Sequence, residues 1–180
     1  MALLRKVVVS ILVVVGLAVG AGFVLPSTIH VERSIAIAAP PEQVFAEIAD
    51  FNAWNTWSPW AAIDPNTQMS ISGTGTNQKM VWSSEDPRVG AGTQEVVAST
   101  SPTYFKTHLE FNGQGMGDAT FQLVENDDST QVTWSFDSDM REGIPVAMKP
   151  VNTYLGFFMD SMLGPDYEAG LQNLKATLEG

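Results

Sequence analysis

The sequence predicts an α+β fold: a curved antiparallel sheet of about seven strands wraps round a long C-terminal helix, behind one N-terminal transmembrane or signal helix. Residues 7–25 form an uncharged apolar run, and most of the chain between residues 65 and 150 alternates between apolar and polar side chains. Residues 150–179 repeat apolar side chains at helical spacing. Such a helix needs a surface on which to bury its apolar stripe, and a curved sheet supplies one.

The composition excludes several classes of function. The 180 residues include 9 Lys+Arg and 20 Asp+Glu, for a net charge of -11. An acidic body without a basic cluster argues against nucleic acid as a partner, because nucleic-acid binding relies on cations that displace counterions. The absence of cysteine excludes disulfides, thiolate catalysis and Cys-based zinc sites.

The N-terminal run is long enough to cross a bilayer. Arg5 and Lys6 precede Val7–Leu25, a run that spans roughly 28 Å as a helix. The two cations favour the cytoplasmic side, which places the following domain on the extracytoplasmic side, periplasmic or extracellular. We therefore divide the chain into a transmembrane signal anchor or signal peptide, residues 1–26, and a domain, residues 27–180.

Two interpretations of this segment remain open. It is either an uncleaved signal anchor or a signal peptide cut after the small residues Val19-Gly20-Ala21. We favour the anchor, because the apolar run continues past that site. Gly16 and Gly20 form a G-x-x-x-G pair that would suit a weak homodimer, although glycine is in any case common in membrane helices.

The domain begins with a strand and a short helix. Residues 29–37 alternate as a half-buried strand does, and Arg33 is the one charged residue on its apolar side. Pro40-Pro41-Glu42 starts a helix, since proline is tolerated in the first turn and a carboxylate suits the positive end of the dipole. Three tryptophans follow at a spacing of three residues, in a short helical or irregular turn.

The centre of the chain reads as successive strands joined by turns. Because the links are short, neighbouring strands should pair antiparallel. The expected strands are residues 68–72, 79–83, 93–99, 103–111, 118–125 and 130–137. Glycines at positions 113, 115 and 117 suggest a hairpin rather than a phosphate loop, because no Lys-Ser/Thr follows them.

The last 30 residues read as the long helix. Gly164-Pro165 disfavours helical geometry there, so we expect either one kinked helix or two helices, roughly residues 150–162 and 165–178. We expect the first to form a mobile gate with Tyr154, Phe158 and Met162, and the second to clamp the sheet.

Short sequences along this order resemble the START-like (SRPBCC) superfamily, and within it the polyketide cyclase/dehydrase-like group. The matching sequences are Val31-Glu32-Arg33-Ser34-Ile35, Pro40-Pro41-Glu42-Gln43-Val44-Phe45, Trp57-Ser58-Pro59-Trp60, Met80-Val81-Trp82-Ser83, Thr120-Phe121-Gln122-Leu123, Val132-Thr133-Trp134 and Gly164-Pro165-Asp166-Tyr167. The resemblance covers residues 29–179 and implies a helix-grip fold with a deep apolar cavity between the long helix and the sheet. The N-terminal membrane segment is an addition to that fold.

Polar constellations give little support for catalysis. His30 and His108 lie on polar strand faces without a partner motif, and they fit solvated histidines better than a zinc site. The carboxylates Asp137, Asp139 and Glu142 surround Arg141 and fit a solvated acidic loop. We therefore name no catalytic residues, metal ligands or cofactor, and we regard an enzyme as the less favoured interpretation.

Aromatic and methionine side chains on the inward faces are the remaining candidates for a ligand-binding site. Most of these build an ordinary core, but flexible methionines near the final helix also suit a binding surface for varied apolar ligands. The candidate ligand-binding residues are Trp60, Met80, Trp82, Phe105, Phe121, Trp134, Tyr154, Phe158 and Met162.

We therefore expect a module that binds a lipid-like or other hydrophobic small molecule near the membrane. A polyketide cyclase/dehydratase-like enzyme and an interaction module with a filled core are the two alternatives.

Overall fold

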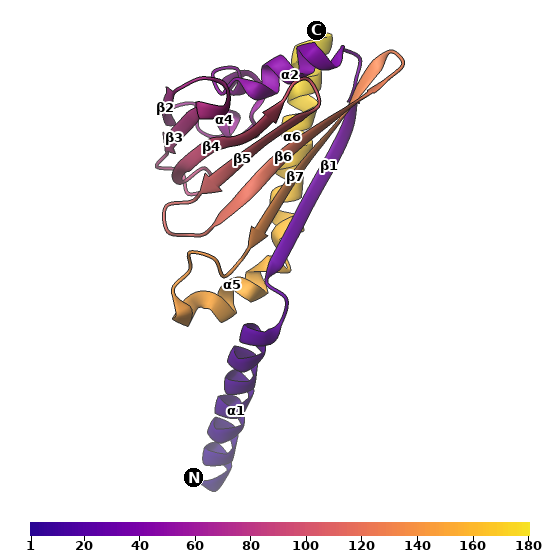
Figure 1. The fold of residues 1–180 in the computed structure, drawn as a ribbon. Coiled ribbons are helices and arrows are strands. Elements are labelled where there is room, and N and C mark those ends of the chain that lie inside the picture. Colours follow the sequence, from indigo (N-terminus) through magenta and orange to yellow (C-terminus); the bar gives the residue numbers. More distant parts are fainter.

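The computed structural model describes residues 1–180 and shows one helix extending away from a sheet-and-helix domain (Figure 1). Helix α1 (Ala2–Val24) is long and apolar enough to cross a membrane, a property that anchors and signal sequences share. Its side chains are almost all exposed. A methyl group added to Gly16 or Gly20 would have no atom within 4 Å, so that face of α1 is open, and dimerisation through it stays a prediction.

The domain contains one antiparallel sheet of seven strands in the order β1-β7-β6-β5-β4-β3-β2, which confirms the expected sheet. The strands are β1 (Thr28–Ile37), β2 (Gln68–Ser72), β3 (Lys79–Ser83), β4 (Ala91–Thr100), β5 (Tyr104–Glu110), β6 (Met116–Asn126) and β7 (Ser129–Asp139). Phe105 of β5 lies opposite Phe121 of β6, which lies opposite Trp134 of β7. Side chains in register on one face therefore form a continuous apolar surface.

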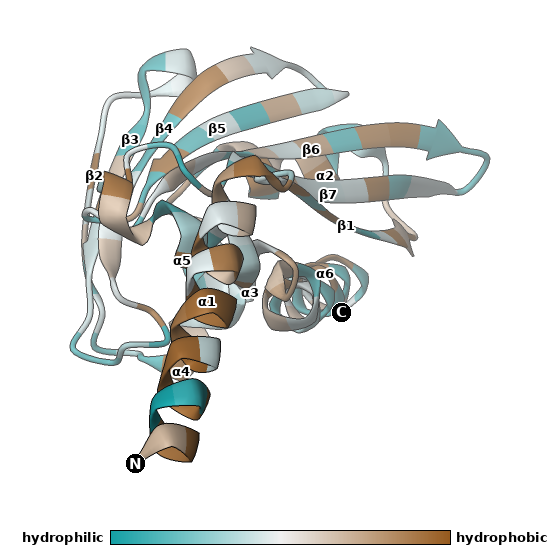
Figure 2. Ribbon diagram, turned by 90° about the horizontal axis from the view of Figure 1, so that it is seen from below, coloured by the Kyte–Doolittle hydropathy of each residue, from teal (hydrophilic) through white to brown (hydrophobic).

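Helices cover that apolar face. They are α2 (Pro41–Ala49), α3 (Trp54–Trp57), α4 (Pro59–Ile63) and the long α6 (Met159–Glu179), with short 3₁₀ turns η1 (Gly75–Asn77) and η2 (Val146–Met148) in the connections. Seen from below, the sheet curves round these helices, with α6 beneath the β1–β7 side (Figure 2). Twenty buried apolar residues form one core between the two layers.

The C-terminal helix is broken earlier than the sequence predicts. Helix α5 (Lys149–Gly156) ends before Phe157 and Phe158, and α6 continues through Pro165 without interruption. The expected division into two helices at Gly164-Pro165 is therefore wrong. Because Gly164 has no Cβ, it avoids part of the steric clash that a proline imposes on the residue before it.

Helices α1 and α5 both lie at one end of the sheet, which we call the α1 end (Figure 1). Strands β1, β4 and β6 begin there, whereas β3, β5 and β7 end there. The chain enters β1 from α1 at this end and leaves β7 towards α5. Figure 1 shows α5 between this end of the sheet and the last turn of α1.

Candidate functional site

The space between α6 and the centre of the sheet is filled by aromatic side chains. The ring of Tyr167 in α6 stacks on Trp134 with ring centroids 3.8 Å apart and an interplanar angle of 14°. Phe121 also stacks on Trp134, and Trp57 closes the cluster from α3. These side chains are almost completely buried. The resemblance implied a deep cavity here, and the structure has a packed core instead.

A cavity of about 470 Å³ lies at the α1 end of the sheet. It sits where β3 ends, β4 begins and the β5–β6 hairpin turns, and Gly143 from the loop after β7 also borders it. Its lining residues are Val81, Trp82, Ala91, Gly92, Thr93, Glu110, Asn112, Gly113, Gly115, Met116 and Gly143. The volume falls within the range of small-molecule binding pockets.

Glycines shape this cavity. Gly113 and Gly115 adopt φ angles of 82° and 119°, which side-chain-bearing residues rarely adopt, so the β5–β6 hairpin can turn tightly at the rim. A methyl group on Gly92 would lie 2.5 Å from Cη2 of Trp82, so only glycine lets the indole ring lie across β4. The glycine-rich hairpin was predicted from the sequence, but its place in a cavity wall was not.

The nine residues singled out as ligand contacts lie in three places. Phe105, Phe121, Trp134 and Met80 belong to the buried core, and Trp60 packs against Trp134 at its border. Trp82 lines the cavity. Tyr154 lies in α5, while Phe158 and Met162 are about 60% exposed where α5 passes into α6.

The cavity lining offers a few polar groups beside the apolar ones. Thr93, Glu110 and Asn112 supply a hydroxyl, a carboxylate and an amide, and Glu110 is the only titratable side chain among the lining residues. The apolar side chains are Val81, Trp82, Ala91 and Met116. A guest would therefore meet both apolar side chains and a few hydrogen-bonding groups.

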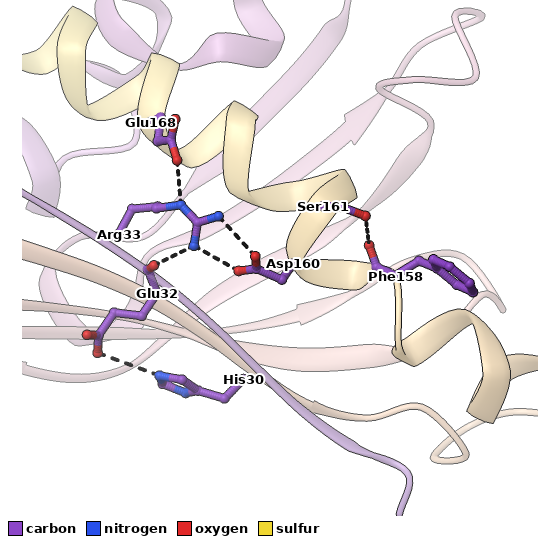
Figure 3. Close-up of polar contacts among 7 residues, drawn as sticks. All are labelled: His30, Glu32, Arg33, Phe158, Asp160, Ser161 and Glu168. Atoms are coloured by element: carbon purple, nitrogen blue, oxygen red, sulfur yellow. Dashed lines mark hydrogen bonds and ion pairs between the residues drawn. The ribbon is translucent and has the colours of Figure 1, made fainter.

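A smaller cavity of about 200 Å³ lies between the start of β1 and the α5–α6 junction. Close to it, Arg33 of β1 holds α6 in place through two carboxylates, with Nη1 2.8 Å from Asp160 and Nε 2.6 Å from Glu168 (Figure 3). Gly164 lies between them, and its missing side chain makes room for the guanidinium group. The charged residue on the apolar side of the first strand is thus explained by its contact with α6.

The two histidines belong to a row of charges on the outer face of the sheet. His30 Nδ1 lies 2.7 Å from Asp137, and His108 Nδ1 lies 2.7 Å from Asp118. Burial opposes the ionisation of Asp118, but hydrogen bonds from Lys106 and His108 outweigh burial and lower its pKa. No group of three or more potential metal ligands is found in the structure. Each histidine has a carboxylate partner, which was not predicted from the sequence.

Arg141 connects the domain to α1. Its Nη2 donates hydrogen bonds to the carbonyl oxygens of Gly22 and Leu25, at 2.9 and 2.5 Å, and its Nε donates to Thr153 Oγ1 at 2.9 Å. A cation at the C-terminal end of a helix both satisfies free carbonyl groups and complements the helix dipole. From the sequence, Arg141 was expected to lie in a solvated acidic loop. It is the one cation in that loop, and this was the only feature of the sequence that could have indicated a structural contact.

A family model described as "Polyketide cyclase / dehydrase and lipid transport" matches residues 28–179. The chain belongs to this family. No curated protein matches the chain significantly in sequence. The match begins at the first residue of β1, so α1 lies outside the part that the polyketide cyclase/dehydrase and lipid transport family shares.

Solved structures agree with the fold of this family. A START superfamily protein from Mycobacterium smegmatis superposes with a TM-score of 0.59 at 17% identity, covering 83% of this chain and 97% of that one. A Thermobifida fusca protein gives a TM-score of 0.60 at 17% identity over 81% and 90% of the two chains. A Chromobacterium violaceum protein gives 0.51 at 22% identity over 86% and 99%. At such identities the likeness shows the helix-grip fold alone.

Proposed function

We propose that this chain binds a hydrophobic, lipid-like small molecule in the cavity at the α1 end of the sheet, as a domain anchored to the membrane by α1. The observation that carries the proposal is the position of the cavity, at the same end of the sheet from which the membrane-length helix leaves. A ligand that partitions into lipid would have a short path between bilayer and cavity. The description of the family, polyketide cyclase/dehydrase and lipid transport, supports a hydrophobic guest.

The lining residues suggest how such a guest would be held. Burial of apolar ligand surface contributes about 25 cal/mol per Å², and Trp82 and Met116 supply the larger apolar side chains of the wall. A few polar groups then fix orientation. Glu110 would accept a hydrogen bond from a ligand hydroxyl or amide group, with Asn112 beside it. Of the residues singled out in the sequence, we propose Trp82 as the ligand contact.

Binding explains the lining better than catalysis does. Acid–base catalysis of a cyclisation or dehydration needs one group to take a proton and another to return it, unless a single group is recycled between steps. The lining contributes one titratable side chain, Glu110. An enzyme of the cyclase type is therefore our second candidate, and it would depend on that carboxylate.

We also propose that α1 remains attached as an uncleaved anchor and that the domain lies on the extracytoplasmic side. The hydrogen bond from Tyr154 to the Ala18 carbonyl oxygen supports retention, because cleavage after Ala21 would remove an acceptor that the folded domain uses. The cations Arg5 and Lys6 before the apolar run support the sidedness.

The test compares two substitutions on β4. Ala91→Phe adds an aromatic ring to the cavity wall, whereas Val97→Phe adds one to an exposed position, 52% accessible, that lines neither cavity. We expect native mass spectrometry of the full chain released from nanodiscs to show bound lipid for the wild type and Val97→Phe but not for Ala91→Phe. Equal lipid occupancy in all three proteins would refute the cavity as the binding site.

A further inference from the structure

Exposed apolar side chains of the domain are concentrated in one segment. Outside α1, eleven large apolar residues are strongly exposed, and seven of them lie within residues 146–162. They are Val146, Met148, Val151, Leu155, Phe157, Phe158 and Met162. The other four are scattered over β2, β3, β4 and β6. A cluster of this kind on a soluble surface marks an interaction site.

The cluster faces away from the domain. In α5 the buried residues are Pro150 and Thr153, whereas Val151 and Leu155, one turn apart, point outward. Figure 3 shows the ring of Phe158 turned away from the ion pairs that join α6 to β1. From the sequence, this apolar stripe was expected to face the sheet, but periodicity identifies the apolar side of a helix without identifying what covers it.

The cluster is continuous with α1. Gly22 of α1 approaches Pro150 of α5 so closely that a methyl group on Gly22 would lie 2.6 Å from Pro150 Cβ. Tyr154 Oη donates a hydrogen bond to the carbonyl oxygen of Ala18 at 2.6 Å. Helix α5 therefore contacts α1 at two levels, both of them within the apolar run.

These contacts set the depth of α5. Ala18 precedes Leu25, the last residue of the apolar run, by seven positions, which corresponds to roughly 10 Å along a helix. If α1 spans the bilayer with Leu25 at the edge of the hydrocarbon, the Tyr154 hydroxyl reaches roughly 10 Å below that edge, about as deep as interfacial helices bury their apolar face. The tyrosine ring is apolar, and the Ala18 carbonyl supplies the partner that its hydroxyl needs at that depth.

We propose that residues 146–162 form an apolar collar around the end of α1 that inserts into the bilayer interface and seats the domain on the lipid surface. The occupant of this surface is lipid, because the collar is continuous with a helix of membrane length. The inference does not rest on a ligand in the cavity. It predicts that the cavity, at the same end of the sheet, is held at a constant distance from the bilayer.

The charges near the collar indicate how it binds. The collar itself contains one cation, Lys149, and one carboxylate, Asp160, and Asp139, Arg141 and Glu142 precede it in the chain. Arg141 is already engaged with α1. Without a basic cluster, attraction to anionic lipids contributes little, so insertion depends on apolar burial. The collar should therefore bind neutral and anionic lipid bilayers equally well, and its binding should not depend on salt concentration.

The experiment uses the absence of cysteine from the chain. Single cysteines replace Leu155 or Phe158 in the collar, and Val97 or Val124 as controls; the side chains are 46%, 60%, 52% and 57% exposed, respectively. Each full-length variant carries an environment-sensitive fluorophore and is reconstituted in phosphatidylcholine bilayers with brominated acyl chains. Circular dichroism confirms that each variant is folded.

We expect brominated lipid to quench the labels at positions 155 and 158 several-fold more than those at 97 and 124, at low and high salt alike. Quenching at 155 and 158 no greater than at the controls would overturn the collar. So would quenching that requires anionic lipid, or self-quenching at position 158 that depends on protein density without lipid quenching, which would indicate a second copy. The Ala91→Phe variant should leave the quenching unchanged, so failure of the collar and failure of the cavity are separate results.

Discussion

At the residue scale, the packing of α6 on the aromatic core depends on the absence of a side chain at Gly170. A methyl group there would lie 2.9 Å from Trp134 Cζ3 and 3.0 Å from Pro59 Cδ, both in rigid rings. Glycine to alanine in an ordinary helix interior stabilises by about 1 kcal/mol. At this position overpacking should dominate, and we expect Gly170→Ala to lower the free energy of unfolding by about 1–3 kcal/mol.

The measurement is thermal or denaturant unfolding of the full chain in detergent micelles, followed by the near-ultraviolet circular dichroism of the tryptophans. Gln172→Ala is the matched control in the same helix. Gln172 is exposed, so its replacement by alanine should change stability less than overpacking at Gly170 does. Equal or greater stability of Gly170→Ala would show that α6 packs less tightly on Trp134 than the structure indicates.

A second residue-scale prediction concerns His30. Its hydrogen bond with Asp137 raises its pKa above the ordinary value of 6.5, burial opposes the rise, and Glu32 adds to it. Because the folded pKa is raised, this contribution to stability is complete below pH 6.5 and is lost as pH rises through the folded pKa. The side chain is 55% exposed, so the contribution should stay below about 1 kcal/mol.

We therefore expect unfolding measured from pH 5.5 to pH 8.5 to show a decline in stability that His30→Gln reduces. Asp118, whose pKa is lowered, stays ionised across this range and does not contribute to the decline. An unchanged slope in His30→Gln would mean that the contact with Asp137 does not persist in solution.

At the element scale, the sequence located strands more reliably than it located the break in the last helix. Each strand has one face on the core, so alternation marks it directly. Proline disfavours a helix at the residue before it, but two local features allow α6 to continue through Pro165. Gly164 lacks the Cβ that would clash, and Arg33 binds Asp160 and Glu168 on either side of Pro165, which ties both halves of α6 to one strand.

Because α6 continues through Pro165, we predict that this proline lowers stability without being needed for the shape of the helix. Pro165 is exposed, and Pro165→Ala restores a backbone donor to the helix, so we expect the free energy of unfolding to rise by about 1–2 kcal/mol. Thermal unfolding measures the gain. A loss of stability would mean that the proline shapes the helix, contrary to the continuous α6 described above.

At the scale of the whole molecule, the sequence predicted the architecture but not where the empty space lies. Trp134 and Phe121 fill the core whereas Trp82 borders a cavity, although all three are aromatic residues on inward strand faces. Whether such a residue packs in the core or borders a cavity depends on the geometry of loops and hairpins from distant parts of the chain. The outward stripe of α5 was misassigned for a related reason, since a bilayer and a protein core select the same apolar side chains.

The attachment of α1 to the domain leads to a prediction about the mature protein. The domain contacts α1 on both sides of the small-residue site at Val19-Gly20-Ala21. Tyr154 binds Ala18 before the site, and Arg141 and Pro150 contact residues 22–25 after it. Cleavage after Ala21 would remove the Ala18 carbonyl that accepts from Tyr154 and leave a charged N-terminus beside the collar. We expect intact-mass analysis of the membrane fraction to show a single species that retains α1. A dominant species beginning at Gly22 would show that α1 is a signal peptide, and the anchored arrangement would then be wrong.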